Sequence, residues 1–293
     1  MTHSQVRASP VPAPTGASAV HVRGLTKSYG DTHAVRGLDL DIGYGEIFAI
    51  LGPNGAGKST TIEILEGNRK RDAGQVRVLG EDPGSAGRDW RARIGIVLQE
   101  VSDAGMLTVR EIMQMFTSCY RTPRDPGEVL ELVGLAAVSG SRVRALSGGQ
   151  RRRLDVALGI VGTPELLFLD EPTTGFDPEA RRQFWELIRL LAADGTTILL
   201  TTHYLEEAAA LADRVAVIAA GRVVAVDSPA RLTAHVDTAA TVRWEDGDVV
   251  HVERTDRPTY LIRQRSRYGD ELANLTVTRP TLEDAYLQLI GLA

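Results

Sequence analysis

Cysteine and long apolar runs are scarce in this sequence, and each scarcity narrows what the chain can be. A single cysteine, Cys119, cannot form a disulfide within the chain, and we expect it to be a small buried apolar residue. The most apolar long stretch, residues 154–169, is broken by charged residues, glycines and a proline. It is therefore a poor candidate for a membrane span, which needs about 20 consecutive apolar residues.

Basic charge is also in short supply. The 293 residues carry 33 basic and 38 acidic side chains, which gives a net charge of −5. Because the phosphate backbone of nucleic acids favours a basic face, this balance argues against nucleic acid as a partner. The sequence is 43% hydrophobic, enough for a sizeable core. The run of three arginines at residues 151–153 is interpreted as a solvated helix face.

Short apolar runs alternate with helical stretches, which predicts an α/β fold with a mainly parallel sheet. Residues 47–51, 166–169 and 197–200 are apolar on both faces, as buried central strands are. Residues 179–193 carry apolar side chains at helical spacing and are predicted to form a crossover helix. Strand pieces between residues 19 and 42 predict a small antiparallel sheet ahead of this core.

These patterns divide the chain into three predicted segments. Residues 1–18 hold three prolines and no apolar core of signal-peptide type, so we expect a disordered tail. Residues 19–235 form the predicted α/β domain. Residues 236–293 show short strands between charged turns, followed by a helix with carboxylates in its first turn. This last segment is predicted to be a small accessory α+β domain.

A glycine-rich loop follows the predicted strand that ends at Leu51. Residues 52–59 fit the pattern G-x-x-x-x-G-K-[ST]. Glycines let backbone N–H groups curl around phosphate oxygens, and the helix that follows directs its N-terminus at the anion. Lys58 then reaches the β- and γ-phosphates, and the hydroxyl of Ser59 ligates Mg²⁺. The predicted ATP-binding residues of this phosphate loop are Gly52, Pro53, Asn54, Gly55, Ala56, Gly57, Lys58, Ser59 and Thr60.

Two carboxylates follow the buried strand at residues 166–169. In a parallel sheet the carboxyl ends of the strands face the ligand crevice. Asp170 is therefore placed to hold Mg²⁺, and Glu171 to orient or deprotonate an attacking water. Such a pair alone is weak support, because acidic residues after strands often cap the next helix. Its combination with the phosphate loop makes the prediction strong.

The sequence Leu-Ser-Gly-Gly-Gln at residues 146–150 opens a predicted helix. Ser147 and Gln150 fit a capping box. Capping does not explain two glycines in the first turn, where each destabilises the helix. Bare N–H groups beside a serine hydroxyl form a second phosphate-binding surface. One nucleotide could contact both this surface and a phosphate loop only if two chains meet.

The Leu-Ser-Gly-Gly-Gln sequence, which lies between the phosphate loop and the acidic pair, resembles the signature of the ATP-binding-cassette (ABC) transporter ATPases. The resemblance covers residues 20–231 and implies a P-loop NTPase core with a helical signature subdomain. It implies that Tyr29 stacks on adenine and that Gln99 joins the Mg²⁺ and water shell. It also implies that Asp177 crosses the dimer interface and that His203 contacts the γ-phosphate. The residues implied to contact the ATP of a second copy are Ser147, Gly148, Gly149, Gln150 and Asp177.

Residues 61–67 and 280–287 are similar to the ATPase subunits of the type 2 export branch, which includes the daunorubicin/doxorubicin resistance ATP-binding proteins. This similarity implies an ATPase that uses ATP and Mg²⁺ and dimerises head to tail. It would act at the cytoplasmic face of a bacterial membrane. Its second partner would be a separate integral membrane permease that expels a drug or another lipophilic compound.

Two other functions are compatible with a phosphate loop. Soluble ABC ATPases that act on ribosomes or chromosomes generally carry two cassettes or a long coiled coil, and neither is visible here. A small GTPase or a kinase would leave the signature helix unexplained, and the sequence has no Asn-Lys-x-Asp guanine motif. We therefore expect a transport ATPase.

Overall fold

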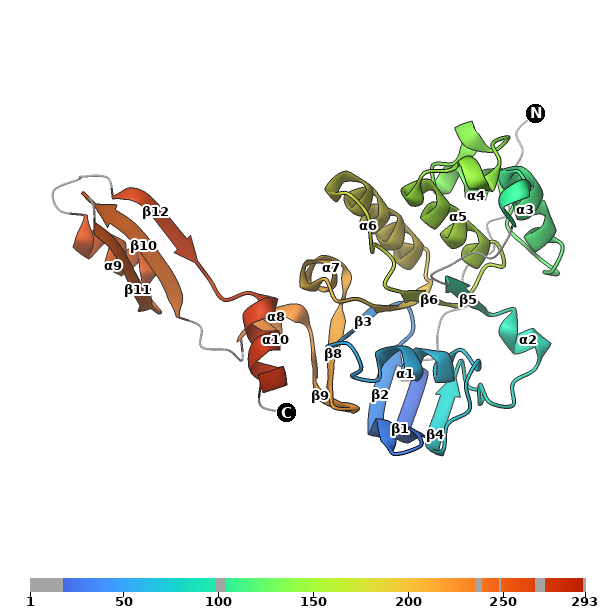
Figure 1. The fold of residues 1–293 in the computed structure, drawn as a ribbon, viewed down its shortest axis with the longest axis horizontal. Helices are drawn as coiled ribbons and strands as arrows, with labels where there is room; N and C mark the ends of the chain where they lie inside the picture. Colours follow the sequence, from blue (N-terminus) through green and yellow to red (C-terminus); the bar gives the residue numbers. More distant parts are fainter. Residues whose placement is uncertain (1–17, 98–103, 235–238, 248, 267–271, 292–293) are drawn as a thin grey trace.

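The computed structural model describes residues 18–97, 104–234, 239–247, 249–266 and 272–291. Figure 1 shows a larger body built around a mixed sheet and, apart from it, a small sheet with one helix. The predicted tail lies outside the described residues except for Ser18, which begins the first strand. None of the helices in these ranges is both long and apolar enough to cross a membrane.

A six-stranded sheet with the order β5-β6-β7-β3-β8-β9 forms the centre of the larger body. The neighbouring strands in the order β5-β6-β7-β3-β8 pair in parallel, and β9 is antiparallel to β8. This confirms the predicted, mainly parallel sheet. All residues of β3 and β7 are buried, as expected for strands covered on both faces. The strands are β3 (Ile47–Leu51), β5 (Ile94–Val97), β6 (Leu166–Asp170), β7 (Thr197–Thr201), β8 (Arg214–Ala219) and β9 (Arg222–Asp227).

Alternate residues of these strands face two separate cores. Phe48 and Ile50 of β3 pack with α1 and with the antiparallel sheet on one face. Ala49 and Leu51 pack with the helices on the other face, mainly α3 to α7. The helices of the larger body are α1 (Lys58–Leu65), α2 (Arg88–Arg91), α3 (Val109–Thr117), α4 (Pro126–Leu132), α5 (Gly148–Ile160), α6 (Pro178–Ala193), α7 (Leu205–Leu211) and α8 (Pro229–Ala234), with short 3₁₀ turns at Ala104–Met106, Ala136–Val138 and Val143–Ala145.

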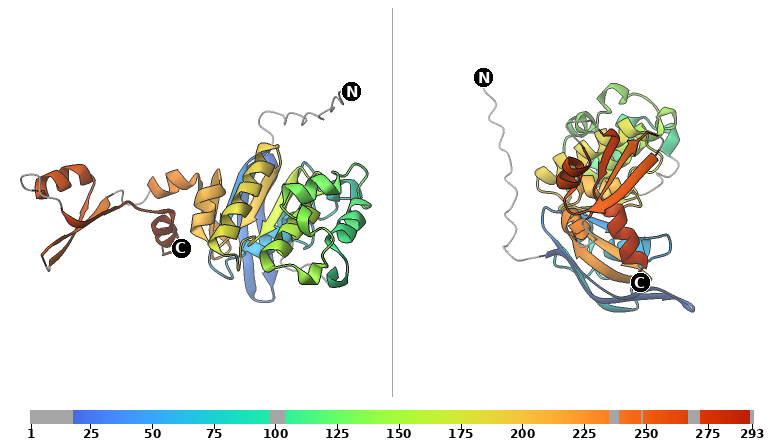
Figure 2. Two further views of the ribbon diagram at one scale, coloured as in Figure 1. Left: turned by 90° about the horizontal axis from the view of Figure 1, so that it is seen from above. Right: turned by 90° about the vertical axis from the view of Figure 1, so that its left-hand side faces the viewer.

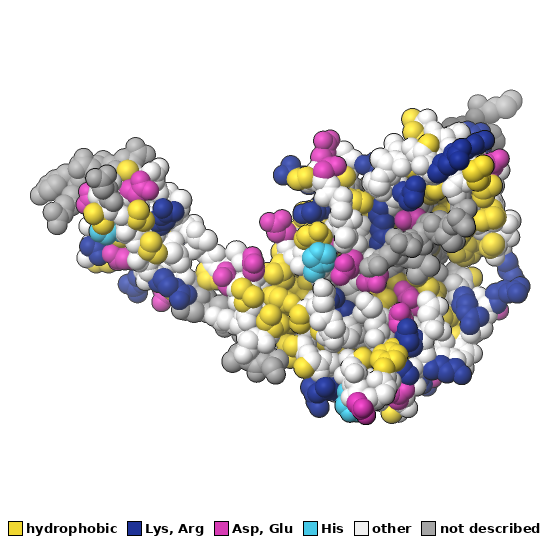
Figure 3. All heavy atoms as spheres, in the orientation of Figure 1, with side chains coloured by type: hydrophobic (Ala, Val, Ile, Leu, Met, Phe, Trp, Pro, Cys, Tyr) yellow, Lys and Arg dark blue, Asp and Glu magenta, His cyan; other side chains and the backbone are white. Residues whose placement is uncertain are grey.

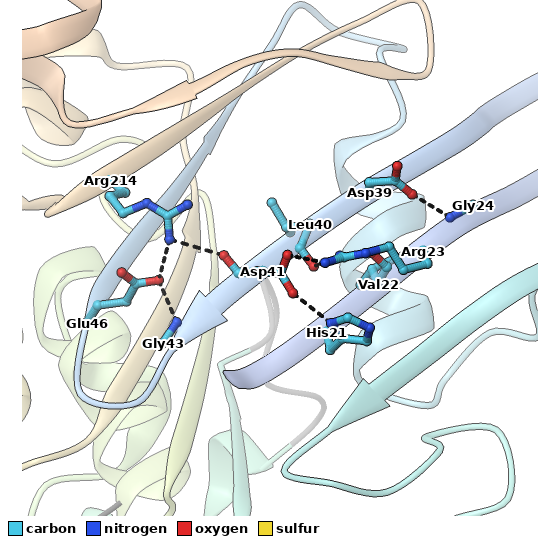
Figure 4. A network of polar contacts seen from close by, with 10 residues as sticks. All are labelled: His21, Val22, Arg23, Gly24, Asp39, Leu40, Asp41, Gly43, Glu46 and Arg214. Carbon is cyan, nitrogen blue, oxygen red and sulfur yellow. Dashed lines mark hydrogen bonds and ion pairs between the residues drawn. The ribbon is translucent and has the colours of Figure 1, made fainter. Parts of the chain in front are cut away.

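The predicted antiparallel sheet is confirmed and has the order β2-β1-β4. Its strands are β1 (Ser18–Tyr29), β2 (Thr32–Gly43) and β4 (Ala73–Val78). Figure 4 shows how polar contacts fasten it to the central sheet: Nη1 of Arg214 donates to the backbone oxygen of Asp41 at 3.2 Å and to Glu46 at 3.3 Å. Burial raises the pKa of Glu46, although Arg214 and the N–H of Gly43 oppose the shift. This network anchors the start of β3, the strand that leads into the phosphate loop.

Cys119 follows α3 and is exposed, so the prediction that it is buried is wrong. Helix α3 buries Val109, Ile112 and Met113 and ends at Thr117. Cys119 lies beyond this end, where the helical spacing that directs apolar residues inward no longer applies.

The C-terminal region contains a three-stranded antiparallel sheet with the order β11-β10-β12 and one helix on it. The strands are β10 (Ala240–Asp246), β11 (Val249–Thr255) and β12 (Ala273–Thr278), and the helix is α9 (Pro258–Arg265). Val242, Trp244 and Leu261 form the small core between them.

The last helix, α10 (Leu282–Gly291), packs on the larger body rather than on this small sheet. Figures 1 and 2 show it beside α8. Leu282 belongs to the core of the larger body, and Tyr286, Leu289 and Ile290 pack against that core. The domain boundary between residues 235 and 236 stays a prediction. Helix α10 lies after this boundary in the sequence but packs on the domain before it.

Candidate functional site

The predicted phosphate loop lies between β3 and α1. Two of its glycines leave no room for a side chain. Gly57 has a φ of +100°, and a Cβ there would lie 2.4 Å from the backbone oxygen of Ala34. A Cβ on Gly52 would lie 2.4 Å from the backbone oxygen of Ile218. The loop is therefore held tightly between β2 and β8, while residues 53–55 are exposed.

Replacing Gly57 with alanine is expected to cost more stability than replacing Gly55. Both glycines have positive φ values, and a left-handed backbone costs an alanine about 1–2 kcal/mol. At Gly57 the added Cβ also collides with Ala34, which adds about 1–3 kcal/mol of overpacking. At Gly55 nothing lies within 4 Å. Urea unfolding of the two variants measures the difference, and equal losses would show that the close contact at Gly57 is unimportant.

Lys58 is folded back onto its own loop. Its Nζ donates to the backbone oxygens of Gly52 at 2.8 Å and Pro53 at 3.2 Å. The side chain is buried, and burial lowers its pKa, an effect that the nearby charges of Glu171 and Asp170 oppose. A partly desolvated ammonium next to the N-terminus of α1 is suited to bind a phosphate.

Thr201 links both members of the acidic pair at the carboxyl end of β6. Its hydroxyl donates to Oδ1 of Asp170, and the N–H of Glu171 lies 3.1 Å from both oxygens of Thr201. Thr201 was not among the site residues predicted from the sequence. The available signal was its place at the end of the neighbouring parallel strand, in register with Asp170.

The Glu171 carboxylate is brought close to His203. Oε2 of Glu171 lies 3.3 Å from Nδ1 of His203 and 3.4 Å from the hydroxyl of Thr174. Glu171 has a φ of +44°, a left-handed conformation that is uncommon outside glycine. Such a conformation persists only where the surrounding structure holds it.

Glu66, at the end of α1, makes folding stability depend on pH. It is 7% exposed, and burial raises its pKa from 4.5 to about 7, with smaller contributions from Asp170 and Glu63. The protonated Glu66 side chain therefore contributes fully to the free energy of unfolding below pH 4.5, and this contribution is lost as the pH rises through 7. The loss is about 3 kcal/mol. Burial also raises the pKa of Asp155 to about 7. We therefore expect Glu66→Gln to reduce the loss of unfolding free energy between pH 5 and pH 8 by about 3 kcal/mol, not to abolish it. Parallel curves for the two proteins would contradict the assignment.

The signature residues and the Asp177 loop share one surface hollow of about 480 Å³. Ser147 caps α5 in the predicted capping box: the N–H of Gln150 donates to its hydroxyl at 3.2 Å, and its own N–H donates to Oε1 of Gln150 at 3.0 Å. Asp177 caps α6 by accepting the N–H of Ala180 at 2.8 Å. Among the described residues, the hollow is lined by Gly134, Ser147, Gly148, Gly149, Gln150, Arg153, Gly175, Phe176, Asp177, Glu179, Ala180 and Gln183, none of them from the phosphate loop.

Tyr29 lies at the end of β1 and is 42% exposed. The guanidinium of Arg69 lies 5.2 Å from its ring centre and the ammonium of Lys27 lies 5.5 Å away. An exposed ring among cations is suited to stack on a base. Gln99, the other residue implied by resemblance to act near the nucleotide, lies outside the described residues.

Comparison with known proteins places this arrangement in a family. The profile described as ABC transporter matches residues 35–174. A second profile, described as an AAA domain, putative AbiEii toxin of a type IV toxin–antitoxin system, matches residues 142–207. The daunorubicin/doxorubicin resistance ATP-binding protein DrrA of Streptomyces peucetius is 46% identical, over 93% of this chain and 92% of that protein. The Nod factor export ATP-binding protein I of Rhizobium sp. (strain N33) is 38% identical, over 93% and 97% respectively.

Solved structures agree with the sequence relatives. CbiO1 from Clostridium perfringens, part of the ABC transporter complex cbiONQ, is 29% identical with a TM-score of 0.68, over 74% of this chain and 91% of that chain. An ATP-binding subunit of an ABC transporter superposes with a TM-score of 0.70 at 22% identity, over 93% of this chain and 99% of that chain, and so shares the fold. The protein therefore belongs to the ABC transporter family and is an ATP-hydrolysing subunit of a transport system.

Proposed function

We propose that two copies of this chain enclose ATP head to tail, each ATP lying between the phosphate loop of one protomer and the N-terminus of α5 of its partner. The observation that carries the proposal is the hollow shared by Ser147 and Asp177, which no described residue of the phosphate loop lines. The free N–H groups at the start of α5 suit a phosphate, but they need a nucleotide presented by another chain. The solved dimeric structure of MJ0796, a bacterial ABC transporter cassette that is 25% identical to this chain, supports dimerisation.

The residues proposed to hold Mg²⁺ are Ser59, Asp170 and Gln99. Hydroxyl, carboxylate and amide oxygens are the hard ligands that Mg²⁺ prefers. Asp170 lies at the carboxyl end of β6, and only its Oδ1 is engaged by Thr201 in the contacts described above. Ser59 is exposed in the first turn of α1, directly after Lys58. When bound at these residues, Mg²⁺ would neutralise the negative charge that develops on the phosphate oxygens during hydrolysis.

Glu171 is proposed as the group that orients the attacking water and accepts its proton. It is 23% exposed, so its carboxylate reaches solvent from a rigid strand end. His203 lies beside Glu171 and is proposed to donate to the γ-phosphate oxygens. ATP contacts both protomers and therefore binds the closed dimer more tightly than ADP does. Hydrolysis of ATP to ADP then favours the open state.

The transported compound is proposed to be a drug or another lipophilic molecule that leaves the cell through a separate membrane permease. The relatives named for daunorubicin resistance and for Nod factor export support outward transport. Figure 3 shows Lys and Arg side chains among Asp and Glu side chains on the visible face, rather than one continuous basic patch.

Efflux of daunorubicin from cells tests this proposal. The chain is expressed together with a candidate membrane permease, and retained drug is measured by fluorescence. We expect wild-type cells to retain several-fold less drug than cells carrying Glu171→Gln, and the chain to sediment with membranes only when the permease is present. Equal retention would reject this drug as cargo. Sedimentation with ribosomes or DNA would instead favour a soluble ABC ATPase.

A further inference from the structure

Arg152 is a buried cation to which the proposed catalytic scheme assigns no role. It lies on α5, two residues after Gln150, and is 8% exposed. The interpretation of residues 151–153 as a solvated face is therefore wrong for its middle member. Neighbouring helical residues point about 100° apart, so three in a row cannot all avoid the protein interior when α5 is covered on most sides.

The Arg152 guanidinium holds the backbone on both sides of Glu171. Its Nη2 donates to the backbone oxygen of Asp170 at 2.8 Å. Its Nε donates to the backbone oxygen of Pro172 at 3.1 Å. A planar fork with several fixed donors can bind two carbonyl groups at once, which an ammonium group cannot do in the same geometry.

Buried carboxylates balance this cation. Nη1 of Arg152 lies 3.9 Å from Oδ2 of Asp155, one turn along α5. Burial lowers the pKa of Arg152, and the charges of Asp155, Asp170 and Glu207 oppose that shift. Glu207 is itself fully buried on α7 and accepts a hydrogen bond from Trp185 of α6 at 3.1 Å. Arg152 is therefore placed where α5, α6 and α7 meet the end of β6.

Glu171 needs such support. Its φ of +44° is a strained conformation for a residue with a side chain. Thr201 holds its N–H, and Arg152 holds the carbonyl groups immediately before and after it. The direction of the Glu171 side chain therefore depends on where α5 lies relative to β6.

We propose that Arg152 is a positioning residue that sets Glu171 for hydrolysis according to the position of α5. This rests on the proposed function. In the proposed dimer, α5 contacts the ATP of the partner's phosphate loop, whereas Glu171 acts on the ATP of its own loop. The Arg152 clamp, defined as its two bonds to the carbonyl oxygens of Asp170 and Pro172, thus couples the two ATP sites of one dimer.

The variant Arg152→Gln tests the clamp. A small misplacement of a reacting group can lower a rate by about 100-fold, so we expect kcat to fall roughly 10- to 100-fold. The KM for ATP should change less than threefold, and the Hill coefficient for ATP should fall towards 1. Arg152→Lys keeps the charge but not the planar fork, so its kcat should lie between those of the wild type and Arg152→Gln. Arg151→Gln is the matched control, because Arg151 is exposed, and it should hydrolyse ATP like the wild type.

Combination with Glu171→Gln separates positioning from other roles. If Arg152 acts through Glu171, adding Arg152→Gln to Glu171→Gln should leave residual hydrolysis unchanged, and the double variant should still dimerise with ATP. A further fall by the same factor as in the single variant would overturn the proposal, as would wild-type kcat and Hill coefficient in Arg152→Gln. If Arg152→Gln does not fold, Arg152→Lys carries the same comparison. Full activity of Glu171→Gln alone would reject the proposed function rather than the clamp.

Discussion

Replacing Lys58 with alanine is expected to reduce ATP affinity about 30- to 100-fold, the usual worth of a charged hydrogen-bonded contact, and to abolish measurable hydrolysis. The side chain is buried with its ammonium on the loop carbonyls, so no other described lysine can replace it. Titration with a fluorescent ATP analogue measures the affinity. Hydrolysis is measured by phosphate release.

Lys70→Ala is the matched control for Lys58→Ala. It removes the same charge from an exposed position beyond the end of α1. We expect its ATP affinity and hydrolysis to stay within twofold of the wild type. Unchanged ATP binding in Lys58→Ala would contradict the assignment of residues 52–59 as the phosphate loop.

Glu171→Gln is expected to slow hydrolysis by about 100- to 10,000-fold, the range for loss of a general base. The amide keeps the shape of the side chain but cannot accept the proton of the attacking water. ATP binding should remain, so the ATP-bound dimer should accumulate. Size-exclusion chromatography with ATP and with ADP measures this: a dimer is expected with ATP only.

Glu206→Gln serves as the control for Glu171→Gln, since Glu206 is an exposed carboxylate in the first turn of α7 to which the proposed mechanism gives no role. It should hydrolyse ATP normally and form no long-lived dimer. Hydrolysis at the wild-type rate by Glu171→Gln would remove Glu171 from the role of base.

The parts of the site that depend on short-range sequence were predictable. The phosphate loop stands between a buried strand and a helix because residues 47–51 are apolar on both faces and residues 52–59 contain the required glycines. The start of α5 at Gly148 follows from the capping box of Ser147 and Gln150, and both of its hydrogen bonds are present. The proposed roles of these residues stay predictions.

The parts that depend on contacts between distant segments were not predictable. The burial of Arg152 is set by the packing of α5 against the end of β6, which a run of arginines does not reveal. The packing of α10 on the larger body depends on the direction that the chain takes after β12, which the local sequence does not determine. The resemblance implied that His203 and Glu171 act at the same phosphate, but not that their side chains contact each other directly.

A mixture of two inactive variants tests the shared ATP site most directly. Glu171→Gln disables the base, and Ser147→Arg blocks the exposed tip of α5. In a head-to-tail dimer of one copy of each, one site carries both changes and the other carries neither. Each variant alone should hydrolyse almost no ATP, and a one-to-one mixture of the full-length chains should regain a substantial fraction of wild-type activity. If the mixture stays as inactive as its components, the ATP is not shared between protomers in the way proposed.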